Sequence, residues 1–511
     1  MTSAPARQGT EEEYSPDPRR WRALSVTLAA GFMTLLDVSI VSVALPSIQQ
    51  GLGTDPAGAQ WVVSGYALTF GLALVPAGRL GDAFGRRRMF LIALTAFVAF
   101  SALCGAAPTI ELLVVARLLQ GFAAGSLAPQ NSGLIQSLFR GAERGRAFGF
   151  FGATVGISTA AGPIVGGLLL AAFGEPDGWR WIFYVNVPIG VLAVVLAARL
   201  LPRAQSGERP HIDWAGAALL GGAVLALLLP LVQAESGGIA RLWWLFPIGV
   251  ALAVLFLWWE RREVRRGAEP LFDIRLVTET SGYAPGALLG LVYFTGFSGV
   301  WIVFAQFFQS GLGYTPLQSG LSVTAFAVGS AVSAVVAGRL VERFGRRLTV
   351  FGLSLVAVGV AATAAILALV PGEIAGIAAA PALLLGGIGG GFVISPNITM
   401  TLRNVPVRMA GSAGGALQTG QRVGAAIGTA VVAGVFYGVL GAAGDSYRAA
   451  ITGALGVAVL TTLVALGVGI HDLRDERRRA AGVGAPDPDA PDTRDGRASA
   501  DDETPHHIAH D

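Results

Sequence analysis

The sequence predicts an all-α integral membrane protein whose helices cross the bilayer many times. Hydrophobic residues make up 53% of the 511 residues and charged residues only 14%, whereas charged residues make up about 25% of a typical soluble domain. The apolar residues gather in runs of the roughly 20 residues that a helix needs to cross a bilayer core. The 70 glycines favour the close helix packing of membrane bundles.

Fourteen apolar runs, taken in order along the chain, define the predicted helices. The first six cover residues 23–46, 60–79, 89–107, 109–128, 147–172 and 182–201. Two more cover 214–233 and 243–259, and the last six cover 284–308, 317–337, 349–370, 374–400, 412–439 and 449–470. The first run follows a polar, arginine-containing arm and is too long for the apolar region of a cleavable signal peptide.

The arginines fall mainly on one side of the predicted membrane. All 36 basic residues are arginines. Two of them, Arg117 and Arg422, fall inside apolar runs, and Arg180, Arg241 and Arg448 fall on the opposite side from all the others. Because loops rich in positive charge stay in the cytoplasm, both termini are predicted to be cytoplasmic, in a multi-pass protein of the plasma membrane. Arginine without lysine is compatible with a GC-rich bacterial genome.

A repeated segment divides the chain into two halves. Residues 78–88 (GRLGDAFGRRR) follow the second run, and residues 338–347 (GRLVERFGRR) follow the tenth. The two runs are eight helices apart and therefore share an orientation, which indicates a parallel repeat about an axis along the membrane normal. A positive-inside anchor would need only the arginines. The glycines and the acid favour a conformational role instead, and its predicted residues are Gly78, Asp82, Gly85, Arg86, Gly338, Glu342, Gly345 and Arg346.

Six helices in each half leave two between the halves. The predicted organisation is a disordered cytoplasmic arm over 1–22, an N-terminal six-helix bundle over 23–201 and a linker with two extra transmembrane helices over 202–280. A C-terminal six-helix bundle over 281–471 and a disordered cytoplasmic tail over 472–511 follow. The arm and the tail have too few apolar residues to fold alone.

Several classes of function are excluded by composition. The single cysteine, Cys104, rules out disulfide frameworks and cysteine-based metal clusters, and all five histidines lie outside the apolar runs, so no metal site is predicted. A phosphate-binding loop needs a lysine, which the chain lacks. No cluster of His, Asp or Glu suggests an enzyme active site, and a net charge of +3 does not indicate nucleic-acid binding. We therefore predict no cofactor and no catalytic residue.

One acidic residue, Asp37, falls well inside a predicted span. A charge at the centre of a bilayer costs about 2.5–3.5 kcal/mol on insertion scales, so such a residue is a functional candidate by default. Arg117 is its natural partner, because at 1.5 Å per residue both lie about 13 Å from the outer ends of their helices. The pair is either a proton-coupling site, in which protonation of Asp37 weakens its interaction with Arg117, or a permanent structural ion pair.

Six segments resemble the fourteen-span drug:proton antiporter branch of the major facilitator superfamily. They are residues 36–46 (LDVSIVSVALP), 78–88, 117–125 (RLLQGFAAG), 156–167 (GISTAAGPIVGG), 179–190 (WRWIFYVNVPIG) and 411–428. The resemblance implies two six-helix bundles that rock around a central cavity and export driven by inward proton flow. It also implies that the fifth helix carries the antiporter motif, with Gly156, Gly162, Pro163, Gly166 and Gly167, although tight helix packing alone would also need these residues.

The substrate is less defined than the fold. Aromatic and polar side chains in the spans are tentative cavity residues: Tyr66, Tyr293, Phe294, Trp301, Gln306 and Arg422. Ordinary packing also explains aromatic residues at helical spacing, and Arg422 either faces the cavity or bonds carbonyl groups of its own bundle. The predicted partners are a small lipophilic substrate, protons and the lipid bilayer. The alternatives are a dedicated exporter of one endogenous metabolite and a transport-inactive membrane sensor; the oligomeric state is open, with a monomer plausible.

Overall fold

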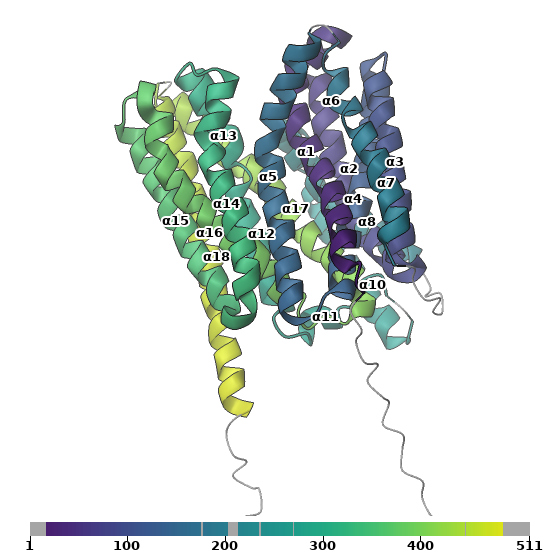
Figure 1. Ribbon diagram of the computed structural model, residues 1–511. Helices are drawn as coiled ribbons and strands as arrows, with labels where there is room; N and C mark the ends of the chain where they lie inside the picture. The colour runs from purple at the N-terminus through teal and green to yellow at the C-terminus, as the bar shows by residue number, and fades with distance from the viewer. Residues whose placement is uncertain are drawn as a thin grey trace, which may run out of the picture.

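The computed structural model describes residues 17–174, 177–202, 213–234, 237–268, 270–444 and 446–483. Throughout these ranges the regular elements are helices, and Figure 1 shows them gathered into two bundles that stand side by side. The first turn of α1 and the last turn of α18 lie at the same end of the molecule (Figure 1). We call this end the terminus side.

The N-terminal bundle contains helices α1 to α7. Their bounds are Arg20–Leu52 (α1), Pro56–Phe84 (α2), Arg86–Ala106 (α3), Ile110–Leu138 (α4), Gly141–Phe173 (α5), Arg180–Tyr184 (α6) and Asn186–Leu200 (α7). Short polar caps set where they begin: Asp55 Oδ1 accepts a bond from Gly58 N at 2.8 Å at the start of α2, which satisfies a free amide of the first turn. The predicted span 182–201 is thus a pair of helices with a break at Val185.

Four helices follow the first bundle, α8 (Trp214–Val232), α9 (Gly238–Leu242), α10 (Leu245–Arg265) and α11 (Arg275–Thr278). Helices α8 and α10 occupy the two extra spans predicted between the halves. They pack against each other, and α8 also contacts α2 of the first bundle and α17 of the second. The extra pair therefore touches both halves of the protein.

The C-terminal bundle contains α12 to α18. Their bounds are Tyr283–Phe297 (α12), Val300–Gln306 (α13), Pro316–Phe344 (α14), Arg346–Leu369 (α15), Ala375–Thr401 (α16), Ala410–Ala442 (α17) and Tyr447–Val483 (α18). A π-helical turn over Phe307–Gly311 follows α13, and 3-10 turns precede α16 and α17. The predicted span 284–308 is therefore interrupted between α12 and α13.

Twelve helices in the described residues are long and apolar enough to cross a membrane. Helices α5, with 33 residues, and α10, with 21 residues, lie where the fifth and eighth spans are predicted. The described helices thus agree with a multi-pass, all-α membrane fold. The total of fourteen spans stays a prediction.

The helices extend further than predicted at both ends of the chain. Helix α1 begins at Arg20, inside the predicted arm, where Arg20 Nη2 pairs with Glu143 Oε1 at 2.9 Å. Helix α18 continues to Val483, inside the predicted tail, and its Asp472 pairs with Arg346 Nε at 2.6 Å. Ion pairs to other helices thus accompany both extensions. The rest of the arm and tail, 1–16 and 484–511, lies outside the described residues.

The two bundles meet closely at the terminus side. Helix α5 packs against α14, and α2 packs against α17. Glycines allow this approach: a Cβ on Gly338 would lie 2.5 Å from Gly145 O, and a Cβ on Gly411 would lie 2.6 Å from Gly78 O, distances that real side chains do not adopt. Figure 1 shows the ribbons of the two bundles diverging toward the other end. The conformation is therefore closed at the terminus side.

Candidate functional site

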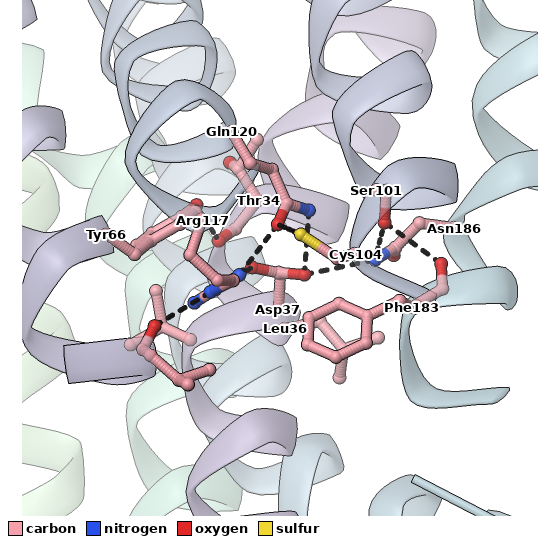
Figure 2. Close-up of polar contacts among 12 residues, drawn as sticks. Thr34, Leu36, Asp37, Tyr66, Ser101, Cys104, Arg117, Gln120, Phe183 and Asn186 are labelled. Carbon is pink, nitrogen blue, oxygen red and sulfur yellow. Dashed lines mark hydrogen bonds and ion pairs between the residues drawn. The ribbon is translucent and has the colours of Figure 1, made fainter. Parts of the chain in front are cut away.

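Asp37 and Arg117 form an ion pair in the middle of the N-terminal bundle (Figure 2). Asp37 lies on α1 and Arg117 on α4, and Arg117 Nη1 donates to Asp37 Oδ2 at 2.5 Å. Neither residue has measurable exposure to solvent. The structure thus brings together the two residues that the sequence places at the same depth, and the contact is direct rather than through water.

Two amide side chains complete the surroundings of the carboxylate. Gln120 Nε2 and Asn186 Nδ2 each donate to Asp37 Oδ1 at 3.1 Å. Asn186 is the first residue of α7, and its amide also donates to Ser101 Oγ at 3.2 Å. Neither Gln120 nor Asn186 is among the predicted site residues. Gln120 does fall inside the segment 117–125 and Asn186 inside the segment 179–190, both of which carry the family resemblance, and this is the signal that could have identified them.

Arg117 is held by contacts of its own. Its Nε donates to Val62 O at 2.9 Å, and its Nη1 also reaches Gln120 Oε1 at 2.8 Å. The guanidinium lies 4.1 Å from the centre of the Tyr66 ring, a cation–π contact that strengthens where water is excluded. Tyr66 itself is buried, and its hydroxyl donates to Thr34 O at 3.1 Å. Tyr66 therefore packs against this ion pair inside one bundle instead of lining a cavity between the bundles.

The hydrogen bonds around Asp37 match an ionised carboxylate. Its three partners, Arg117, Gln120 and Asn186, all donate to it. A protonated carboxyl would carry a donor of its own that meets other donors, and unmatched buried polar groups cost about 1–3 kcal/mol. Arg117 Nη2 is already buried without a hydrogen-bond partner among the described residues. Binding of a proton would therefore favour a rearrangement of this network.

The segment 78–88 connects the N-terminal bundle to the start of α17. Asp82 Oδ1 and Oδ2 accept bonds from the backbone amides of Gly411 and Ser412 at 3.0 and 2.9 Å, so that a carboxylate caps the positive end of a helix in the other bundle. Arg86 Nη2 donates to Asp82 Oδ1 at 2.9 Å and also bonds Val407 O. Gly85, between α2 and α3, has a φ of +94°, a backbone conformation that residues other than glycine rarely adopt. This segment is thus a clamp across the bundle interface.

The second copy of the segment makes different contacts. Arg346 Nε pairs with Asp472 Oδ2 on α18 at 2.6 Å, and Arg346 Nη1 donates to Asn397 Oδ1 at 2.6 Å. Gly338 contacts α5, as described above, and Gly345 has a φ of +52°. Glu342 Oε1 lies near Gly141 at the start of α5, 3.3 Å from the position of a Cβ on that glycine. The repeat in sequence is therefore only partly a repeat in contacts.

Helix α5, which carries the predicted antiporter motif, uses its glycines in two places. A Cβ on Gly162 would clash with Ser39 of α1, and one on Gly166 would lie 3.1 Å from Ile40. Gly156 faces α14 of the other bundle, with Ala331 N at 3.4 Å from a Cβ position, whereas nothing lies within 4 Å of one on Gly167. The side chain of Pro163 lies outside the described residues. Gly162 and Gly166 of the motif thus pack closely against α1, whereas Gly156 approaches the second bundle.

The predicted aromatic cavity residues do not form one wall. Tyr293, Trp301 and Phe304 line a small apolar pocket together with residues of α14, α15, α16 and α18, all within the C-terminal bundle. Phe294 stacks edge-on against Tyr293, with ring centres 5.6 Å apart. Gln306 Oε1 accepts a bond from Ser310 Oγ at 3.2 Å near the end of α13. These side chains belong to the C-terminal bundle and Tyr66 to the N-terminal bundle, although Tyr66 and Tyr293 are both part of one large hydrophobic core.

Arg422, on α17, reaches across to the N-terminal bundle. Its guanidinium lies 4.1 Å from the centre of the Phe70 ring of α2, and Phe70 is next to Tyr66, with ring centres 6.1 Å apart. The Arg422 side chain makes no hydrogen bond or ion pair with another described residue. Of the two predicted alternatives, the structure places this cation at the interface between the bundles, not on carbonyl groups of its own bundle.

Comparison with known proteins adds a family assignment. The sequence pattern of the Major Facilitator Superfamily matches residues 27–259 and 286–497. The chain is 38% identical to a probable actinorhodin transporter of Streptomyces coelicolor, over 86% of this chain and 76% of the relative. It is 35% identical to the puromycin resistance protein pur8 of Streptomyces alboniger, over 88% and 91%. Among solved structures, the human organic anion transporter MFSD10 aligns with a TM-score of 0.62 at 15% identity, over 88% and 100% of the two chains. Within the described residues no group of three or more potential metal ligands occurs.

Proposed function

This chain belongs to the Major Facilitator Superfamily, and we propose that it is a proton-coupled antiporter that exports small lipophilic drugs or antibiotics across the plasma membrane by alternating access. The observation that carries the proposal is the ion pair of Asp37 with Arg117, buried in a bundle that otherwise packs apolar helices. Two relatives bear the names of an antibiotic transporter and of an antibiotic resistance protein, which supports export of such compounds.

The proton would act through the Asp37 network. With the termini in the cytoplasm, as the arginine distribution predicts, a conformation closed at the terminus side faces outward. In that conformation Asp37 accepts three hydrogen bonds. Proton binding would form an O–H bond on the carboxylate and remove its charge, which weakens the attraction to Arg117. The weaker contact between α1 and α4 would then favour the inward-facing arrangement, from which the proton leaves.

The terminus-side contacts supply the second element of the cycle. The carboxylate of Asp82 holds the first turn of α17 across the interface, and this contact must break for the bundles to open toward the cytoplasm. Arg86 donates to the same carboxylate at 2.9 Å, so Asp82 would keep a partner after the contact with α17 breaks. Loss of that contact is a discrete change that either binding event, proton or drug, can bias.

Flux measurements in proteoliposomes test the proposed function. We expect an imposed proton gradient to drive accumulation of one or more compounds from a panel of lipophilic antibiotics, with counter-movement of protons recorded by an enclosed pH dye. Transport of many compounds would support a multidrug exporter, and transport of one would support a dedicated exporter. Binding of compounds without any proton-linked flux would contradict antiport and favour a sensor.

Replacement of Arg422 tests substrate recognition at the interface. For an anionic transported compound, we expect Arg422→Gln to raise KM about 10-fold or more, because a charged hydrogen bond contributes about 1.5–3 kcal/mol. Neutral compounds should be transported with nearly unchanged KM, and Arg422→Lys should retain part of the anion preference. Arg448→Gln is the matched control, since Arg448 Nη1 bonds Ala368 O at the far end of the C-terminal bundle. An equal KM change for neutral and anionic compounds would contradict anion recognition.

A further inference from the structure

Two buried carboxyl groups lie together at the terminus-side ends of α8 and α10. Asp213 is the residue that precedes α8 and is 8% exposed, and Glu260 is 0% exposed. Glu260 comes directly after the apolar stretch of α10, which ends at Trp259, so it lies at the membrane surface and outside the spanning stretch. Neither residue belongs to the Asp37 network or to the repeated segments.

The two carboxyl groups differ in their hydrogen bonds. Asp213 accepts two good bonds, from Gly216 N to Oδ1 at 2.8 Å and from Trp259 Nε1 to Oδ2 at 2.9 Å. Glu260 Oε2 accepts one longer bond from Phe272 N at 3.3 Å. Glu260 Oε1 is buried and has no hydrogen-bond partner among the described residues. The hydrogen bonds of Asp213 therefore suit a negatively charged carboxylate, whereas one oxygen of Glu260 accepts no hydrogen bond from the described residues.

The unpartnered oxygen faces Asp213. Both groups flank Gly216: a Cβ built on that glycine would clash with Asp213 Oδ2 and lie 2.9 Å from Glu260 Oε1. The two oxygens are consequently no more than about 5 Å apart, close enough for like charges to oppose each other's ionisation. Two negative charges buried at this separation would be costly. One proton on Glu260 Oε1 removes the repulsion.

The groups around Glu260 act on its pKa in opposite directions, and the net effect is an increase. Burial is the largest influence and raises the pKa of Glu260 to about 8, against the opposing effect of the amides of Phe272 and Leu271. The charge of Asp213, on α8, adds to the increase, and the charge of Arg79, on α2, counteracts it. The groups that act on Glu260 thus come from α8, from α2 and from the segment after α10.

We infer that Glu260 and Asp213 form a proton-binding site on the terminus side that is separate from Asp37 and holds one proton between its two carboxyl groups. The proton forms an O–H bond with Glu260 Oε1 and leaves to bulk water when the pH rises. Asp213 keeps its negative charge throughout because two N–H groups donate to it. The inference does not depend on drug export or on coupling at Asp37.

This site links the extra helices to the clamp at the bundle interface. Arg79 belongs to the segment 78–88, whose Asp82 holds α17. When Glu260 loses its proton, a new negative charge appears near Arg79 and beside Asp213. The folded protein retains a proton on Glu260 that an unfolded chain loses near pH 4.3. The contribution of Glu260 to the free energy of unfolding is therefore largest in acid and decreases as the pH rises toward about 8.

Infrared difference spectroscopy of the purified protein in lipid nanodiscs tests the site directly. A protonated carboxyl gives a C=O band distinct from the amide bands, and we expect the wild-type protein to lose one such band around pH 8. Glu260→Gln should abolish that loss. Glu263→Gln is the matched control, one turn further along the same helix, where Glu263 pairs with Arg266 at 3.8 Å; its titration should resemble that of the wild type.

A second variant keeps the test decisive if Glu260→Gln does not fold. Asp213→Asn removes the neighbouring negative charge, so we expect the band to be lost at lower pH than in the wild type. The inference is overturned if the wild type loses no carboxyl band between about pH 7 and pH 9, or if the loss persists unchanged in Glu260→Gln. A titration that is insensitive to Asp213→Asn would also overturn it, because the two carboxyl groups would then not share a site.

Discussion

Asp37→Asn should abolish proton-coupled export while leaving the protein folded. The neutral amide cannot release or bind a proton, and its side chain still accepts a bond from Arg117 through its oxygen. We expect proton-driven flux in proteoliposomes to fall by at least about 100-fold, the scale of a lost essential proton-transfer group. Passive, gradient-independent exchange of substrate should decrease far less, because it needs bundle movement but no proton.

Two comparison variants separate coupling from structure at Asp37. Asp37→Glu keeps a titratable group and should retain part of the flux. Glu111→Gln removes an exposed acid at the start of α4 and should leave the flux unchanged. Thermal unfolding of each variant shows whether the fold is retained. Proton-driven flux in Asp37→Asn at the wild-type rate would show that the ion pair with Arg117 is structural.

Gly338→Ala should prevent the closure of the two bundles at the terminus side. Its Cβ would lie 2.5 Å from Gly145 O and 2.7 Å from Gly149 Cα, and backbone atoms of two helices cannot move away without separating the bundles. Overpacking of this kind costs about 1–3 kcal/mol, which reduces the ratio of closed to open molecules about 5- to 160-fold. We expect a matching decrease in export rate.

Distances between spin labels measure this change without transport. Labels on Ser137→Cys and Arg343→Cys, at the terminus-side ends of α4 and α14, should report a longer distance in Gly338→Ala than in the parent protein. The native Cys104 is fully buried and does not compete for the label. Gly434→Ala, on α17 with nothing within 4 Å of its Cβ position, is the control. An unchanged distance in Gly338→Ala would contradict the glycine contact as the basis of closure.

The candidate site shows where prediction from sequence works and where it stops. Asp37 and Arg117 stand out because a charge inside an apolar run is rare and costly, and their depths follow from counting residues along two helices. Hydropathy does not single out Gln120 and Asn186, since neutral amides are tolerated in membrane helices; only their places in the segments 117–125 and 179–190 could have pointed to them. The sequence does not identify the partner of Arg346 either, because Asp472 lies in a polar stretch that is predicted to belong to the tail.

Aromatic residues illustrate the same limit. Tyr66 and Tyr293 share a residue type and a position within an apolar run, yet Tyr66 lies against Arg117 and Tyr293 lines a pocket of the other bundle. Hydropathy does not distinguish these places. Which of them a side chain occupies depends on how each helix is rotated against its neighbours.

The amino-acid sequence alone predicts a multi-pass membrane protein with two related halves and one acid well inside an apolar run. These properties are local, because each apolar run must cross the bilayer as a helix whatever its neighbours are. The contacts of Asp82 with α17, of Arg422 with Phe70 and of Glu260 with its neighbour Asp213 become visible only in the folded molecule. Such contacts join helices far apart in the chain, and their geometry depends on the rotation, depth and tilt of both helices, which packing of the whole molecule sets.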